Sequence, residues 1–166
     1  MKKPNLWKYA VAGAAGGLVA SFAMNQFQAL LQMVEKKIQP EKQEKPPEED
    51  EDATVKTAQA ICRAVAGREL QPAEKKPAGA IVHYAYGTVI GAAYGVLTAR
   101  APMVATGRGV AYGAAAWLGG DEIAVPAFGL GKTPSRVPAI SHVKEFVAHV
   151  VYGAVTHGVF QLLARV

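Results

Sequence analysis

Apolar residues gather in four stretches of the chain that contain no Asp, Glu, Lys or Arg. These stretches are residues 9–34, 77–99, 109–120 and 146–164. About 20 consecutive apolar residues cross the hydrocarbon of a bilayer, so the first two stretches are long enough and the last falls just short. Together with their flanks, the stretches predict helices at about residues 7–34, 78–98, 103–125 and 141–164. The pattern predicts an all-α integral membrane protein of one domain, with four transmembrane helices and a short amphipathic interfacial helix.

Proline and capping residues set the predicted helix ends. The third helix starts after Pro102 and stops at Pro126, because proline cannot continue a helix. The fourth helix begins at Ser141, whose hydroxyl is suited to an N-cap.

Charged residues concentrate in the segment between the first two apolar stretches. Residues 35–76 carry nine of the 18 Lys and Arg and ten of the 13 Asp and Glu. Residues 35–52 are rich in Lys, Glu and Pro and cannot bury a core, so they predict a solvated linker. Residues 53–68 predict the amphipathic helix, either on a membrane surface or against the ends of the other helices. Its apolar residues fall at helical spacing: Val55, Ala58, Ile61, Cys62 and Val65.

The N-terminus permits two interpretations. Lys2 and Lys3 before an apolar run resemble a secretory signal, and residues 20–23 (Ala-Ser-Phe-Ala) resemble a cleavage site. The run continues without charge to Val34, however, which favours a retained transmembrane helix.

Composition narrows the classes of partner and site. The net charge of +5 comes from basic residues at segment ends, where their side chains reach headgroups, and no basic patch alternates with aromatic residues. A nucleic-acid partner is therefore not predicted. The single Cys62 excludes an internal disulfide and any metal motif built from several cysteines.

Glycines recur every fourth residue in two of the predicted helices. Gly13 and Gly17 lie in the first helix, and Gly87, Gly91 and Gly95 lie in the second. Small residues at this spacing let helix backbones approach closely, so both sets are predicted to line helix contacts.

The second and fourth helices share the pattern His-x-x-Tyr-Gly-x-Val. It occurs at residues 83–89 and again at residues 149–155. Internal repeats are common in transporters, where binding sites lie between the repeats. Convergence is the other interpretation, because Gly, Ala and Tyr are common in membrane helices.

Ionisable side chains within the apolar segments are the candidate site. Such residues are costly in a membrane and mark a functional site by default. Asp121 and Glu122 are adjacent on a predicted helix and so are not expected to point the same way, and Glu122 is expected to face inward, toward Arg136, His142 or His149. Residues spaced three and four apart share one helix face in the fourth helix. The predicted intramembrane polar cluster comprises His83, Tyr86, Asp121, Glu122, His142, Glu145, His149 and Tyr152.

Several roles are open to this cluster. Histidine beside a buried carboxylate suits a proton relay. His142, Glu145 and His149 offer three metal ligands on one face, but their spacing matches no recognised metal signature, and a haem held by His83 and His149 rests on the repeat alone. Hydrogen bonding between helices is the structural alternative. We therefore predict no metal and no cofactor. The chain has no hydrolase triad, phosphate loop or dinucleotide fingerprint, so an enzyme is not expected.

Three blocks of residues occur in order along the chain. They are His83-x-x-Tyr86-Gly87-xxx-Gly91-xx-Tyr94-Gly95, then Trp117-Leu118-xx-Asp121-Glu122-xx-Val125-Pro126-xx-Gly129-Leu130, and then Pro134, His142 and His149-xx-Tyr152-Gly153. These blocks resemble the YagU-like family of bacterial inner-membrane proteins, over roughly residues 53–163. That family has no known molecular function and is associated with acid resistance, so the resemblance implies location and architecture more than activity.

These observations predict a small structural or accessory protein of the bacterial inner membrane. Its partners are expected to be the lipid bilayer and either further copies of itself or a larger membrane complex, contacted through the glycines. The alternative is a proton- or ion-handling membrane protein linked to acid stress. The two differ in whether the polar cluster surrounds a hydrated cavity or is engaged in local hydrogen bonds.

The distribution of basic residues predicts the orientation of the chain. The side with the termini and residues 98–108 carries Lys2, Lys3, Lys8, Arg100, Arg108 and Arg165, whereas the other side carries the remaining twelve Lys and Arg. Because basic loops stay in the cytoplasm, we expect the insert inside the cell and both termini in the periplasm. Reporter fusions at residue 45 and at the C-terminus measure this directly, and a periplasmic insert would contradict it.

Overall fold

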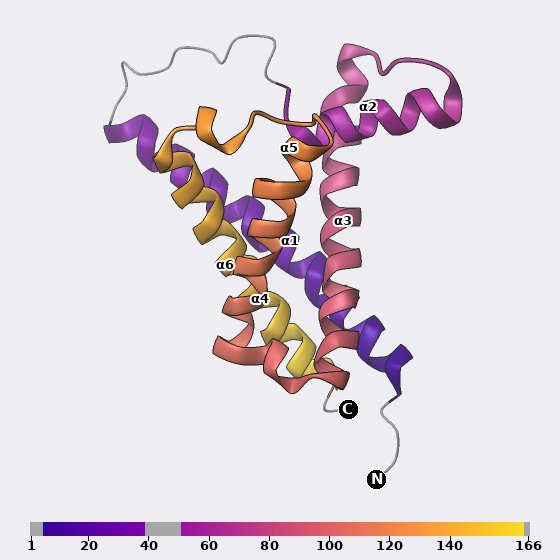
Figure 1. The fold of residues 1–166 in the computed structure, drawn as a ribbon, viewed down its shortest axis with the longest axis vertical. Helices are drawn as coiled ribbons and strands as arrows, with labels where there is room; N and C mark the ends of the chain where they lie inside the picture. The colour runs from indigo at the N-terminus through magenta and orange to yellow at the C-terminus, as the bar shows by residue number, and fades with distance from the viewer. Residues whose placement is uncertain (1–4, 39–50, 165–166) are drawn as a thin grey trace.

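The structure is a computed structural model that describes residues 5–38 and 51–164, and all regular secondary structure in these residues is helical. Its long helices are α1 (Leu6–Ile38), α3 (Pro72–Arg100) and α6 (Ala139–Ala164). Helix α2 (Ala53–Ala66) lies across the upper end of α3, away from the ends of the described chain (Figure 1). The predicted all-α fold is confirmed. Within the predicted linker, residues 35–38 continue α1, and residues 39–50 lie outside the described residues.

The long helices begin earlier than their sequences suggested. Helix α3 starts at Pro72 rather than near residue 78 and includes Pro77 in its second turn, and its first turn is closed by a capping box between Gln71 and Glu74. Pro72 is tolerated at the first helical position, because an N–H there has no partner within the helix. Pro77 lies beyond the first turn and leaves the carbonyl of Ala73 without its helical donor. Helix α6 starts at Ala139, so the prediction that Ser141 caps it is wrong: the N–H of Ser141 donates to the carbonyl of Pro138, within the first turn.

The third predicted helix is not regular, and the prediction of one helix over residues 103–125 is wrong. The 3₁₀ segment η2 (Pro102–Gly109) leads into α4 (Val110–Trp117), the π-helix η3 (Leu118–Ala124) and the short α5 (Val125–Ala127). Positive φ angles of 64°, 56° and 88° at Gly107, Arg108 and Gly109 break η2 from α4, since left-handed backbone interrupts a right-handed helix. Beyond α5, η4 (Pro134–Arg136) lies in the loop to α6.

Two helices of the described chain, not four, are long and apolar enough to cross a membrane. They are Pro72–Arg100 and Ala139–Ala164. The third segment misses the criterion because its helical course is broken into short pieces. Helix α1 is long, but Asn25, Gln26, Gln28 and Gln32 make its second half polar.

Glycines bring the helix backbones into direct contact. On α1 and α3, a Cβ atom added at Gly91 would lie 2.6 Å from the Cα of Gly17, and one added at Gly13 would lie 2.9 Å from the amide nitrogen of Gly95. Gly113 on α4 meets Gly153 on α6 in the same way, with 3.2 Å from its added Cβ to the Gly153 Cα. Side chains larger than hydrogen do not fit at these positions, so the glycines set how close the helices come.

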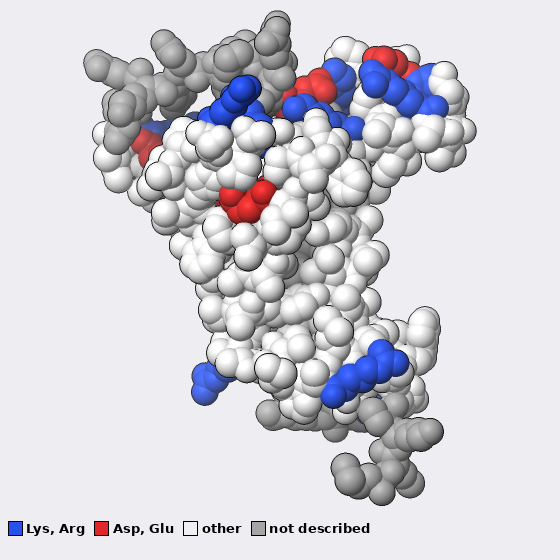
Figure 2. Space-filling view, viewed as in Figure 1, with Lys and Arg blue, Asp and Glu red and all other residues white. Residues whose placement is uncertain are grey.

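The core is thin and the outer surface is apolar. Buried side chains form two small groups, one of Ala20, Met24, Ala148 and Tyr152 and the other of Ala12, Tyr94 and Phe160. Large apolar side chains point outward instead, including Ile81 at 69% exposed and Leu162 at 69% exposed. On the face in Figure 2, a broad band between the two charged ends carries no charge except one acidic patch. A contiguous apolar surface of this kind marks a site of contact with lipid or protein.

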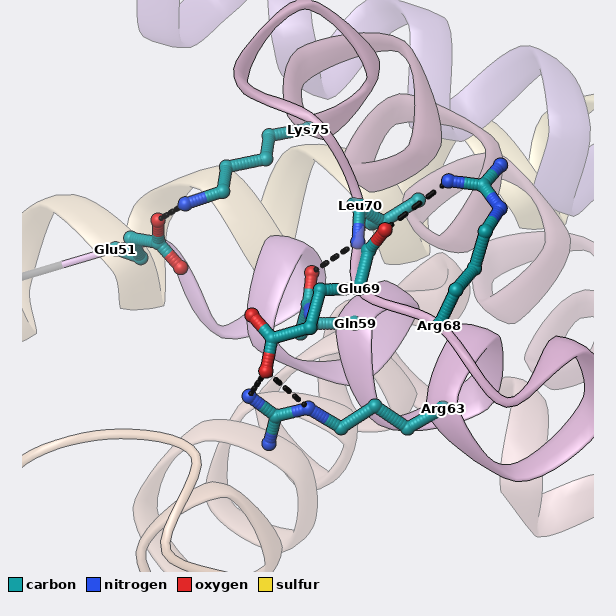
Figure 3. Close-up of polar contacts among 7 residues, drawn as sticks. All are labelled: Glu51, Gln59, Arg63, Arg68, Glu69, Leu70 and Lys75. Carbon is teal, nitrogen blue, oxygen red and sulfur yellow. Dashed lines mark hydrogen bonds and ion pairs between the residues drawn. The ribbon is translucent and has the colours of Figure 1, made fainter.

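Polar contacts hold α2 at the end of α3 (Figure 3). The Asp52 carboxylate caps α2 by accepting from the Thr54 N–H at 2.8 Å, and Gly67 ends the helix with φ of 64°. The Gln59 side chain then accepts from the Leu70 N–H at 3.0 Å across the turn. Exposed ion pairs flank this corner and each contributes little to stability. They are Arg63 with Glu69, Arg68 with Glu74, and Lys75 with Glu51.

The glycine contact between α1 and α3 predicts a large effect from one added methyl group. Gly91→Ala places Cβ against the Gly17 backbone, which cannot move without separating the helices. We expect it to lower the free energy of unfolding by about 1–3 kcal/mol, as overpacking does. Thermal unfolding in detergent measures this. Gly158→Ala on α6 is the matched control, because no atom lies within 4 Å of its added Cβ. Equal stability of the two variants would contradict the contact.

Candidate functional site

A cavity of about 690 Å³ lies between α1, α3, α6 and the η3–α5 segment. It is at the end of the molecule that carries α2 and η4, since Asp52 and Pro134 are also in its wall. The structure brings the whole predicted polar cluster to this one cavity. Its walls include His83, Tyr86, Asp121, Glu122, His142, Glu145, His149 and Tyr152.

Three of these residues converge closely. Asp121, Glu145 and His149 each bring one possible ligand atom, and these atoms all lie within 4.8 Å of one another. The Nδ1 atom of His149 lies 3.6 Å from a carboxylate oxygen of Asp121. The same Nδ1 lies 2.9 Å from the backbone carbonyl of Glu145, and it must be the donor there because a carbonyl oxygen only accepts. The side chain of His149 is 12% exposed and that of Asp121 is 38% exposed, so the cluster runs from a nearly buried histidine to a partly exposed carboxylate.

A second carboxylate–histidine pair lies beside the first. Nδ1 of His142 is 2.5 Å from an Oε1 atom of Glu122, and the two side chains are 24% and 15% exposed. Two acceptors cannot approach this closely, so a proton lies between them. The other ring nitrogen, Nε2, donates to the backbone carbonyl of Pro134 at 3.1 Å. With both nitrogens facing acceptors, His142 fits this site as an imidazolium paired with the Glu122 carboxylate.

The π-helix allows both adjacent carboxylates to reach the same neighbouring helix. On the α-helix predicted for this stretch, Asp121 and Glu122 were not expected to point the same way, and the structure contradicts that expectation. Both lie in η3, and both meet histidines of α6, His149 and His142. The wider turn of a π-helix reduces the angle between successive side chains, and π segments are frequent at functional sites.

Helix α1 contributes contacts that sequence reasoning did not assign to the site. The Gln28 amide donates to Glu145 at 3.0 Å, and the Asn25 amide donates to the Tyr84 hydroxyl at 3.2 Å. Their spacing of three places both amides on one face of the helix, which was the signal available in the sequence.

The two segments with the pattern His-x-x-Tyr-Gly-x-Val differ in environment. Tyr152 is 4% exposed, and its hydroxyl donates to the backbone carbonyl of Gly87 at 2.5 Å, whereas its counterpart Tyr86 is 52% exposed. His149 belongs to the close cluster, whereas the Nε2 atom of His83 is buried in the cavity wall without a hydrogen-bond partner among the described residues. His157 lies outside this cavity and contacts the Tyr94 hydroxyl at 2.6 Å.

The fold and this site define a helical protein with an ionisable cluster at an internal cavity and two helices long and apolar enough to cross a membrane. Residues 40–157 match the family described as "Protein of unknown function (DUF1440)", and the chain belongs to that family. Helix α1 precedes the matched residues. No curated protein and no solved structure matches the chain.

The hydrogen bond from Tyr152 to Gly87 predicts that removing the tyrosine hydroxyl lowers stability in one His-x-x-Tyr-Gly-x-Val segment and not in the other. Tyr152→Phe removes a buried donor, so we expect the free energy of unfolding to fall by about 0.5–1.5 kcal/mol. Tyr86→Phe is the matched control, since the Tyr86 hydroxyl makes no hydrogen bond among the described residues. Thermal unfolding of both variants measures the difference, and a larger loss for Tyr86→Phe would contradict this account of the site.

Proposed function

We propose that the protein is a multi-pass protein of the bacterial inner membrane that takes protons or cations into the cavity between α1, α3 and α6. The observation that carries this proposal is the convergence of Asp121, Glu145 and His149 on a cavity inside an otherwise apolar bundle. We connect this uptake with survival in acid, because the sequence resembles a family that is associated with acid resistance. No enzymatic step is part of the proposal.

Surface chemistry supports the membrane location. Outward-facing apolar side chains suit lipid, as does the band in Figure 2 that carries no charge except one acidic patch. On that face, Lys and Arg lie toward the two ends of the molecule. The two helices that meet the length criterion supply two crossings. Helix α1, at 33 residues, and the α4–η3–α5 segment supply the other two crossings, and Asn25 and Gln28 of α1 and both carboxylates of η3 are in the cavity wall. Irregular backbone is tolerated at membrane depth where it lines a cavity, which suits η3.

Ionisable groups at this depth support proton or cation handling. Carboxylates within a membrane are expensive, and they mark ion pathways and proton relays. The chain has only three acids beyond residue 76, and all three, Asp121, Glu122 and Glu145, are in the cavity wall. Because Glu122 and His142 hold a proton between them, the cavity already contains one exchangeable proton.

The alternative, an accessory subunit of a larger complex, has lost its main support. That interpretation depended on glycine stripes available to a partner. Gly13, Gly17, Gly87, Gly91 and Gly95 instead contact one another within the chain. The surface left for a partner is the apolar exterior, which serves lipid equally well.

Replacement of one titratable group tests the proposal. Glu122→Gln keeps the size of the side chain and its capacity to accept a hydrogen bond from His142, but an amide does not ionise in this range. We expect the variant to fold and insert normally and to abolish any survival advantage that the wild-type protein gives cells at low pH. Survival at equal membrane levels of protein is the measurement.

Glu69→Gln is the matched control for this experiment. It also removes one carboxylate from an ion pair, but at an exposed site far from the cavity, where Glu69 is 70% exposed. Loss of survival in Glu122→Gln alone supports the proposal. Equal survival of the wild type and both variants removes proton handling by Glu122.

A further inference from the structure

We propose that Asp121, Glu145 and His149 form a binding site for a divalent transition-metal ion of the zinc or manganese class. The inference rests on the proposed function in one respect, that the cavity takes up cations, and it names their class. The site draws on two elements far apart in the sequence, η3 and α6.

The separations of the ligand atoms fit one ion. Ligands held at about 2.0–2.2 Å from a single metal lie no more than about 4.4 Å from each other. The three candidate atoms lie within 4.8 Å of one another, so small side-chain rotations close the remaining gap. The other carboxylate–histidine pair in the cavity leaves no space for a metal ion. Nδ1 of His142 and the Glu122 carboxylate are 2.5 Å apart, with a proton already between them.

The surroundings hold the ligands as metal sites require. The Gln28 amide on α1 donates to one oxygen of Glu145 at 3.0 Å, which orients that carboxylate and leaves its other oxygen available. His149 is fixed by its contact to the Glu145 backbone carbonyl. Partners of this kind in the outer shell orient ligands and strengthen binding. The Nε2 atom of His83, in the wall of the same cavity, also has no hydrogen-bond partner among the described residues.

The donor set indicates the class of ion. Two carboxylates and one imidazole combine oxygen and nitrogen ligands, which suits Zn²⁺, Mn²⁺ and related ions. Ca²⁺ and Mg²⁺ prefer oxygen ligands alone, and Mg²⁺ keeps most of its water. No thiol is near, since the only cysteine, Cys62, lies on α2 and not in the cavity wall, which argues against Cu⁺.

Metal binding by the full chain in nanodiscs of uncharged lipid tests the site. Equilibrium dialysis against Zn²⁺, followed by elemental analysis, gives stoichiometry and affinity, and Mn²⁺ is followed by electron paramagnetic resonance. We expect one ion per chain. Asp121→Asn and Glu145→Gln are each expected to weaken binding at least about tenfold. Circular dichroism of each variant verifies that it is folded.

Glu69→Gln is the matched control, because it removes an exposed carboxylate that is not in the cavity wall and leaves the three proposed ligands in place. We expect it to bind Zn²⁺ as the wild type does. The site is overturned if folded wild-type protein binds neither Zn²⁺ nor Mn²⁺, if Asp121→Asn binds as tightly as the wild type, or if Mg²⁺ competes equally with Zn²⁺.

The metal site and the proton-handling proposal fail separately. If Zn²⁺ does not bind but Glu122→Gln still loses survival at low pH, the metal site is wrong and proton handling stands. If Zn²⁺ binds as expected and Glu122→Gln survives normally, the metal site stands and proton handling by Glu122 is wrong.

Discussion

Direct contact between the backbones of α1 and α3 is the constraint on which the rest of the structure depends. Gly17 and Gly91 leave no space for a side chain between them, so the two helices are pinned at one level. From that level they diverge toward the end that carries α2 (Figure 1). The space between diverging helices is too wide for the small side chains of the core to fill. It therefore becomes the cavity, and polar groups from α1, η3 and α6 surround it.

The π-helix is the second element that the site requires. It lies where α4 would otherwise continue, and it sends two successive carboxylates to two different histidines of α6. In one pair, Glu122 and His142 share a proton in a short hydrogen bond. The other group, Asp121 with Glu145 and His149, stays open enough to admit an ion. Two sites with different chemistry thus come from neighbouring residues, because their backbone geometry is irregular.

Sequence reasoning reached the helical fold and the members of the polar cluster, because both follow from local patterns. Uncharged stretches of sufficient length indicate helices, and Asp121, Glu145 and His149 stand out as ionisable residues within them. The glycine spacing likewise marked Gly87 and Gly91 as contact positions. The break at Arg108, the π-helix and the roles of Asn25 and Gln28 were missed. They depend on which helices meet in space, and the pattern of a single segment contains no such information.

The α1–α3 contact has a consequence for the order in which the chain assembles. A ribosome delivers α1 well before α3, and the charged insert lies between them. Until α3 emerges, the glycine face of α1 lacks its partner on that helix, and until α6 emerges, the Gln28 amide lacks the Glu145 carboxylate that it later contacts. Newly made α1 is therefore a helix with an uncovered polar and glycine-lined face. How long this face stays open to other contacts depends on how fast the rest of the chain is synthesised and on what covers the face until then.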